Sequence, residues 1–101
     1  MKIKDIRNVK FKKENIGFAG IILCPFFANE GFPNLPNGWL EPAQKIIKKH
    51  GGVIIADEVQ PGFGRLGSSM WSHDIIGIQP DIVTIGKPMA NGHPVLSLIH
   101  I

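Results

Sequence analysis

Val53-Ile-Ile-Ala-Asp57 is the stretch that decides the predicted fold, and Ile82-Val-Thr-Ile-Gly86 repeats its character. Both runs are short, apolar and rich in β-branched residues, which is typical of strands buried in a parallel sheet. The first run ends on Asp57, and Lys87 follows the second run directly. Because ligands bind beyond the carboxyl ends of parallel strands, this acid and this amine are candidate functional residues.

The segments around these two runs complete an α/β pattern. A third apolar run, Phe18–Cys24, predicts another buried strand, and the Pro-, Gly- and Asn-rich residues 29–38 predict a loop. Apolar spacing then predicts a helix over Trp39–His50, with Gly51 as the residue that ends it. A short helical turn is expected around Met70–Ile76. Strand, helix, strand and strand indicate a mostly parallel sheet built from βαβ units.

The size of the chain predicts an incompletely covered sheet. Parallel sheets are normally buried on both faces, and 101 residues supply few elements to cover them. We therefore expect one face to expose strand residues and the isolated chain to be only marginally stable. The side chains expected on that face are Ile21, Ile22, Ile54, Ile55, Ile82 and Val83.

Composition indicates a soluble globular protein. Apolar residues make up 44% and charged residues 19%, close to the average for such chains. The longest apolar runs are too short to span a bilayer, and no secretory signal follows the N-terminus. The single cysteine, Cys24, excludes an intrachain disulfide and favours a reducing compartment. These features predict a cytoplasmic location.

The positive charge is concentrated at the start of the chain. Residues 1–15 hold six of the eleven basic residues against two acids, a net charge of +4. Such an arm can contact nucleic acid or an anionic membrane, but Phe11 is the only aromatic residue among the lysines, so no base-stacking platform is visible. We interpret residues 1–17 as a basic, solvated surface segment and predict neither a nucleic-acid nor a membrane partner.

Other site chemistry finds little support in the sequence. The four histidines include no i,i+4 pair and no cysteine cluster accompanies them, so no metal site is predicted. An apolar strand that ends in Asp-Glu also occurs in P-loop ATPases. The only Gly-Lys pair, Gly86-Lys87, is followed by Pro88 and does not complete a phosphate-binding loop.

Two long stretches, Val53–Gly67 (VIIADEVQPGFGRLG) and Pro80–Pro94 (PDIVTIGKPMANGHP), resemble the signature of the class-III pyridoxal-phosphate aminotransferases. A weaker resemblance begins near Phe18 and includes Pro36–Leu40. The resemblance implies that residues 18–95 are part of the large, cofactor-binding domain of a fold-type-I pyridoxal-phosphate enzyme. In the family this domain acts in a homodimer, and the expected cofactor is pyridoxal 5′-phosphate.

The resemblance also implies residue roles. Lys87 would be catalytic, forming the Schiff base with the cofactor and then shuttling a proton. Asp57 would meet the pyridine nitrogen and keep it protonated, Val59 would contact the ring face, and Gln60 would hydrogen-bond the phenolic oxygen. Glu58 would be a structural partner rather than a catalytic group.

The chain departs from the family pattern in one strand. Cys24-Pro25 stands where many members have Glu-Pro, which argues against the transaminases of ω-amino acids that use this glutamate. Residues Gly86–Pro94 look nearest to a subgroup of alanine–glyoxylate-like aminotransferases and amino-alcohol-phosphate phospho-lyases. The expected function is amino-group transfer between an amino acid or amine and a 2-oxo acid. The alternatives are a phospho-lyase acting on an amino-alcohol phosphate, and a non-catalytic binding protein led by the basic arm.

The resemblance finally implies that the chain is a fragment. Family members run to several hundred residues, so we expect these 101 residues to be inactive alone. Residues 96–101 do not resemble the family and are interpreted as a tail encoded by a sequencing adapter, excluded from the predicted fold. The alternative is a genuine apolar strand, Val95–Ile99.

Overall fold

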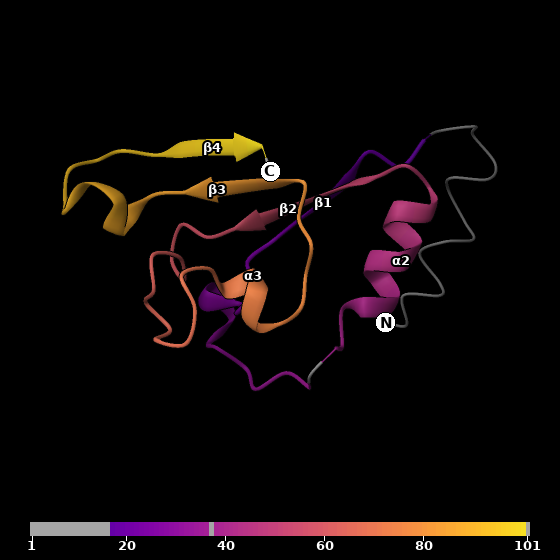
Figure 1. The fold of residues 1–101 in the computed structure, drawn as a ribbon, viewed down its shortest axis with the longest axis horizontal. Coiled ribbons are helices and arrows are strands. Elements are labelled where there is room, and N and C mark those ends of the chain that lie inside the picture. Colours follow the sequence, from indigo (N-terminus) through magenta and orange to yellow (C-terminus); the bar gives the residue numbers. More distant parts are fainter. Residues whose placement is uncertain (1–16, 37, 101) are drawn as a thin grey trace.

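A four-stranded sheet organises the computed structural model, which describes residues 17–36 and 38–100 (Figure 1). The strands are β1 (Gly20–Leu23), β2 (Val53–Asp57), β3 (Ile82–Ile85) and β4 (Ser97–His100), in that order across the sheet. The pairs β1–β2 and β2–β3 are parallel, whereas β3–β4 is antiparallel. The predicted mostly parallel α/β sheet is confirmed. Of the predicted basic segment 1–17, only Gly17 lies among the described residues.

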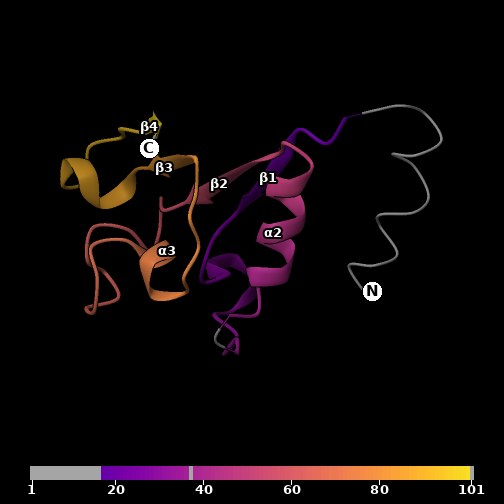
Figure 2. The same cartoon turned by 45° about the vertical axis from the view of Figure 1, so that its right-hand side comes forward.

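The helical elements lie along one side of this sheet and beyond the ends of its strands (Figures 1 and 2). They are α2 (Glu41–Lys49), α3 (Ser72–Ile75) and two 3₁₀ turns, η1 (Ala28–Glu30) and η2 (Lys87–Ala90). The helix predicted over Trp39–His50 is confirmed as α2, with Gly51 in the left-handed conformation (φ +73°) that ends it. Among the described residues, no helix is both long and apolar enough to cross a membrane.

Two apolar clusters cover the helical side of the sheet. Near α2, Ile54 of β2 packs against Leu40, Ala43 and Ile47 of the helix region. A second cluster lies beside the first. In it, side chains from the loop between β2 and β3 and from η2 pack over strand residues. Its buried members are Ala56, Val83 and Ile85, with Phe63, Trp71 and Met89 packed against them. Full burial of each large aliphatic side chain stabilises the fold by roughly 1.5–3 kcal/mol.

The opposite face of the sheet is largely uncovered. Ile22 of β1 is 61% exposed and Leu98 of β4 is 58% exposed, so the prediction of an exposed face is confirmed for this side. The prediction is wrong for Ile21, which packs against the apolar cluster near α2, and for Ile54 and Val83, which are 1% and 0% exposed. Successive strand residues point to opposite faces, and these three point toward the covering elements.

Asp81 joins three elements at the amino ends of the central strands. Its Oδ2 accepts a hydrogen bond from the Ile54 N–H at 2.8 Å, and its own N–H donates to the Ile54 carbonyl at 2.8 Å. Lys48 of α2 forms an ion pair with the same carboxylate. The Lys48 hydrogen bond, then the Ile54 N–H, hold the pKa of Asp81 below its usual value. Asp81 thus fixes α2 and β2 to the start of β3.

The C-terminal residues take part in the sheet. Ser97–His100 forms β4, which runs against β3 with Val83 opposite Ile99 and Ile85 opposite Ser97. Excluding residues 96–101 from the fold was therefore wrong for this segment, since the alternation of side chains suits a strand and β3 offers a free edge. The alternative strand, Val95–Ile99, comes close to the observed one. The adapter origin of these residues stays a prediction.

Candidate active site

The carboxyl ends of β2 and β3 lie at one end of the molecule, the left-hand end in Figure 1. Asp57, the last residue of β2, is paired in register with Thr84 of β3. The Oδ1 atom of Asp57 accepts hydrogen bonds from the Val59 N–H at 3.1 Å and from the Thr84 hydroxyl at 3.3 Å. Within the described part of the chain, its Oδ2 atom has no partner. The carboxylate is thus held on one oxygen and free to accept on the other.

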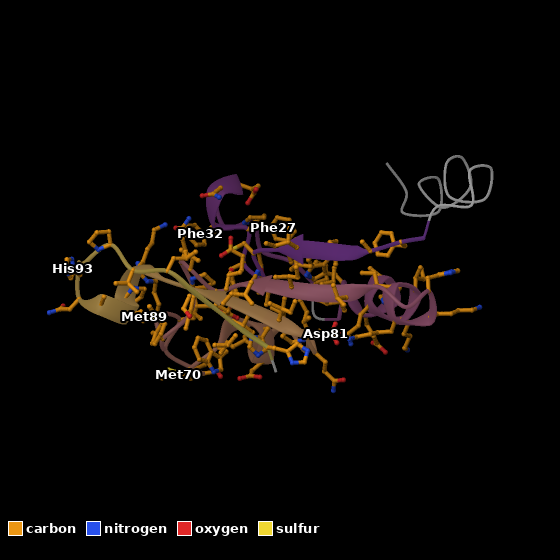
Figure 3. All side chains as sticks on the ribbon, turned by 90° about the horizontal axis from the view of Figure 1, so that it is seen from above. Phe27, Phe32, Met70, Asp81, Met89 and His93 are labelled. Atoms are coloured by element: carbon orange, nitrogen blue, oxygen red, sulfur yellow. The ribbon has the colours of Figure 1, made fainter. Side chains whose placement is uncertain are left out.

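Lys87 stands immediately beyond β3, at the start of η2. Lys87 and Val59 line one open cavity of about 560 Å³ with residues 92–96, among them His93. Figure 3 places Met89 and His93 together at this end of the molecule. The Lys87 side chain is exposed and has no ion pair among residues 17–36 and 38–100. Its amine is therefore available to a molecule in the cavity.

The backbone of Lys87 is strained. Its φ angle is +35°, in the left-handed region that a residue with a side chain rarely adopts, and Pro88 restricts it further. Such a conformation costs on the order of 1–3 kcal/mol and persists only when the surroundings impose it. Here β3 before it and the η2 turn after it fix the direction in which the lysine leaves the sheet.

Gly86 lets Val59 approach the residue before the lysine. A Cβ atom built on Gly86 would lie 3.2 Å from Leu96 Cδ1 and 3.3 Å from Val59 Cγ1, tighter than ordinary contacts. Absence of a side chain at this position therefore keeps the apolar Val59 wall close to Lys87. The pair Gly86-Lys87 thus places the lysine side chain in a cavity with an apolar wall.

Gln60 has a different neighbour. Its Nε2 donates to Oδ1 of Asn29 on η1 at 2.9 Å, and neither Gln60 nor Asp57 lines the cavity that Lys87 and Val59 share. The structure thus brings Val59 and Lys87 together in one cavity and holds Asp57 at the adjacent strand end. Gln60 follows them in the chain but is tied to the η1 turn. The roles assigned to these four residues stay predictions.

Glu58 is a buried carboxylate beside the site that binds the first two residues of α3. It is 0% exposed, and its Oε2 accepts from the Ser72 N–H at 3.1 Å and the Ser72 hydroxyl at 2.7 Å. Its Oε1 accepts from the His73 N–H at 2.8 Å and lies 2.8 Å from His73 Nδ1. The Glu58 carboxylate therefore fixes the start of α3 to the end of β2, because Glu58 directly follows Asp57 in the chain. This confirms a structural role for Glu58. Sequence reasoning did not identify Ser72 or His73.

The described residues contain no group of three or more His, Cys, Asp or Glu side chains arranged to hold a metal ion. His73, the most buried of the histidines in the described residues, is engaged by Glu58 and lies 3.7 Å from the Asp74 carboxylate through its Nε2 atom. Its environment is that of a packing residue, with the ring stacked near Trp71 at a centroid distance of 6.3 Å.

Known proteins are similar to this chain in both sequence and fold. A family model described as aminotransferase class-III matches residues 1–100. The human mitochondrial alanine–glyoxylate aminotransferase 2 is 43% identical over 81 residues, which are 80% of this chain and 16% of that protein. A Caenorhabditis elegans homologue of ethanolamine-phosphate phospho-lyase is 48% identical over 62 residues, 59% of this chain and 13% of that protein. The chain thus spans about a seventh of the length of these relatives.

Solved structures show the same arrangement. A phospholyase from Arthrobacter in complex with phosphoethanolamine superposes with a TM-score of 0.78 at 42% identity, over 83% of this chain and 20% of that one. An omega transaminase from Pseudomonas jessenii in complex with PMP gives a TM-score of 0.73 at 35% identity, over 82% of this chain and 18% of that one. The fold is therefore that of the fold-type-I pyridoxal-phosphate enzymes. More narrowly, the chain belongs to the class-III aminotransferase family.

The family implies pyridoxal phosphate as the cofactor, and the donor set at the strand ends fits it. Asp57 keeps one carboxylate oxygen free to accept from a protonated ring nitrogen, and Val59 supplies an apolar surface. Lys87 supplies an amine that no carboxylate neutralises within the described residues. Each of these groups matches one part of the cofactor, namely its nitrogen, its ring face and its aldehyde.

Proposed function

We propose that this chain is part of the cofactor-binding domain of a pyridoxal-phosphate-dependent transaminase, which transfers an amino group between an amino acid or amine and a 2-oxo acid. The observation that carries the proposal is the placement of Asp57 and Lys87 at adjacent strand ends, with Lys87 in the cavity that Val59 lines. The whole protein is proposed to act as a homodimer, on the strength of the family resemblance alone.

Each residue would contribute a separate physical effect. When bound, the cofactor supplies an electron sink for the substrate carbon. Asp57 would stabilise positive charge on the ring nitrogen through its free Oδ2, in a charge-assisted hydrogen bond of roughly 1.5–3 kcal/mol. Val59 would orient the ring and exclude water from it. Gln60 would donate to the phenolic oxygen, and Lys87 Nζ would hold and move the proton that substrate turnover requires.

Chemical labelling of the full-length gene product tests this proposal. Borohydride reduction of the protein loaded with pyridoxal phosphate should attach the cofactor at Lys87, detected by peptide mass spectrometry. The Lys87→Ala variant should lose the label and at least about 10³-fold of its transaminase rate, since a nucleophile and proton shuttle are both removed. The matched control is Lys45→Ala on the surface of α2, where the lysine meets only Glu41. Label on another lysine would refute the site.

A second candidate reaction is phosphate elimination from an amino-alcohol phosphate. It is supported by the similarity to the phospho-lyase homologue and to the structure that holds phosphoethanolamine. Incubation of the loaded protein with phosphoethanolamine separates the two reactions. Release of inorganic phosphate identifies a phospho-lyase, whereas conversion of a 2-oxo acid to its amino acid identifies a transaminase. Absence of both reactions and of the Lys87 label would favour a non-catalytic binding protein.

A further inference from the structure

The amide of Gln60 is held by a residue for which the sequence suggested no role. Gln60 Nε2 donates to Oδ1 of Asn29 at 2.9 Å, although 31 positions separate the two residues. The bond connects the segment that follows β2 to η1, the turn that follows β1. Among the described residues, Asn29 is therefore the one whose side chain forms a hydrogen bond with the side chain of Gln60, a predicted cofactor-binding residue.

The η1 turn is itself fixed in place. The Phe27 N–H donates to the Cys24 carbonyl at the end of β1 at 3.0 Å, and the Phe27 carbonyl accepts from the Glu30 and Phe32 N–H groups at 3.1 and 3.2 Å. The Phe27 ring lies 5.4 Å from that of Trp39, just before α2. Figure 3 places Phe27 and Phe32 on the flank of the molecule that β1 forms. Asn29 thus stands on a turn anchored to both a strand and a helix region.

A side-chain amide offers a donor on one side and an acceptor on the other. Because Asn29 presents its carbonyl oxygen, Gln60 turns its NH₂ group toward it and keeps the second N–H of that group for another acceptor. A carboxamide turned the other way would present oxygen to oxygen. In this arrangement the contact with Asn29 leaves Gln60 with an N–H group to offer as a hydrogen-bond donor.

We infer that Asn29 is a positioning residue for Gln60, which orients the glutamine amide so that it donates to the phenolic oxygen of pyridoxal phosphate. The inference rests on the proposed function, since it concerns the same cofactor. A donor at this oxygen stabilises its ionised form, so the orientation of Gln60 affects both cofactor affinity and the pH at which the bound cofactor changes its absorption.

Three variants of the full-length protein test the inference. Asn29→Ala removes the acceptor, Asn29→Asp keeps an acceptor oxygen, and Asn34→Ala is the matched control from the neighbouring exposed loop. The measurements are the Kd for pyridoxal phosphate by fluorescence titration and the pH midpoint of the visible absorption of the bound cofactor. We expect Asn29→Ala to weaken binding about three- to tenfold, the factor for one hydrogen bond, and to shift the midpoint upward.

Asn29→Asp and Asn34→Ala should both bind within about twofold of the unaltered protein and keep its midpoint, because an acceptor remains in the first and the contact is intact in the second. Unchanged Kd and midpoint in Asn29→Ala would overturn the inference, as would an Asn29→Asp variant that behaves like Asn29→Ala. If Asn29→Ala does not fold, Asn29→Leu keeps the side-chain size without an acceptor and carries the same expectation. Failure of the unaltered protein to bind the cofactor would instead refute the proposed function.

Discussion

Glu58 shows how one side chain connects the site to the rest of the fold. Its carboxylate is fully buried, and four hydrogen-bonding groups from Ser72 and His73 surround it. A buried charge is costly unless such partners satisfy it. Since Glu58 stands between Asp57 and Val59, the same contacts that satisfy its charge hold the two neighbours of Glu58 in the chain.

Replacing Glu58 with Gln is expected to destabilise the full-length protein. A carboxamide has only one acceptor oxygen, so its NH₂ group would face either the Ser72 or the His73 N–H, donor against donor. We expect a loss of about 1–3 kcal/mol in the free energy of unfolding, the cost of leaving a buried donor unsatisfied. Urea unfolding measures it.

The matched control is Glu30→Gln on η1, an exposed side chain that should change the free energy of unfolding by less than about 0.5 kcal/mol. Equal stability of the two variants would mean that the Glu58 contacts contribute nothing to folding.

Among single residues, the sequence predicts which ones stand at the ends of adjacent strands, but it does not predict the contacts between side chains far apart in the chain. Asp57 and Lys87 could be predicted because apolar runs mark where each strand stops. Ser72, His73 and Asn29 could not be predicted, since each meets its partner only after a loop of irregular backbone has folded. Nothing in the periodicity of the chain encodes the path of such a loop.

Among the elements, α2, β2 and β3 depend on a single carboxylate at their junction. The Asp81 carboxylate accepts a hydrogen bond from the Ile54 N–H and forms an ion pair with the Lys48 ammonium. Both interactions favour the charged form of the carboxylate. Its pKa is lowered on folding, chiefly by the hydrogen bond from Lys48. The resulting stabilisation is fully present above the ordinary aspartate pKa of about 3.9 and is lost as the pH falls below it through the lower folded pKa.

Asp81→Asn should therefore lower the free energy of unfolding by about 0.5–1.5 kcal/mol at pH 7 and flatten its pH dependence in the acid range. Thermal unfolding of the full-length protein between pH 7 and pH 3 measures both effects. The control is Glu41→Gln, because the pKa of Glu41 is also lowered by a lysine hydrogen bond, but on the exposed surface of α2. Solvent screens that pair, so its effect should be smaller. A steeper acid loss in Asp81→Asn than in the unaltered protein would contradict the assignment.

The elements themselves were mostly predictable. The run Val53–Asp57 is β2 without change, and the predicted helix Trp39–His50 loses only its ends, because Leu40 and His50 form the caps of α2. The predicted fold lacks β4 (Ser97–His100), because the interpretation of residues 96–101 as a non-native tail leaves them out of the sheet. Their alternating pattern was correct for a strand, and pairing with β3 depends on a free edge that only the folded sheet reveals.

For the molecule as a whole, the uncovered sheet face governs behaviour in isolation. Ile22 and Leu98 are more than half exposed on it, and Leu96 is 68% exposed beside the cavity. Exposed apolar surface of this kind promotes association, and the free edges of β1 and β4 add unpaired backbone groups. The isolated chain is expected to depend on further covering elements for a stable fold.

We predict that the purified 101-residue chain aggregates or unfolds without a cooperative transition, and that added pyridoxal phosphate gives no specific visible absorbance. Light scattering, differential scanning calorimetry and absorption titration check these points. A double variant, Ile22→Thr with Leu98→Thr, should scatter less light than the unaltered chain, because it reduces the apolar face without touching the site. A sharp melting transition together with tight cofactor binding in the unaltered chain would contradict the prediction.

The missing side chain of Gly86 has a consequence for the design of variants of this protein. A Cβ at this position would lie 3.2 Å from Leu96 Cδ1 and 3.3 Å from Val59 Cγ1, so these two side chains would have to move by a few tenths of an ångström to admit it. Both contacts are with side chains rather than backbone, so they can move without breaking the sheet. The size of the side chain at position 86 should therefore affect the shape of the cavity. Variants with Ala, Ser or Cys at this position would test this effect.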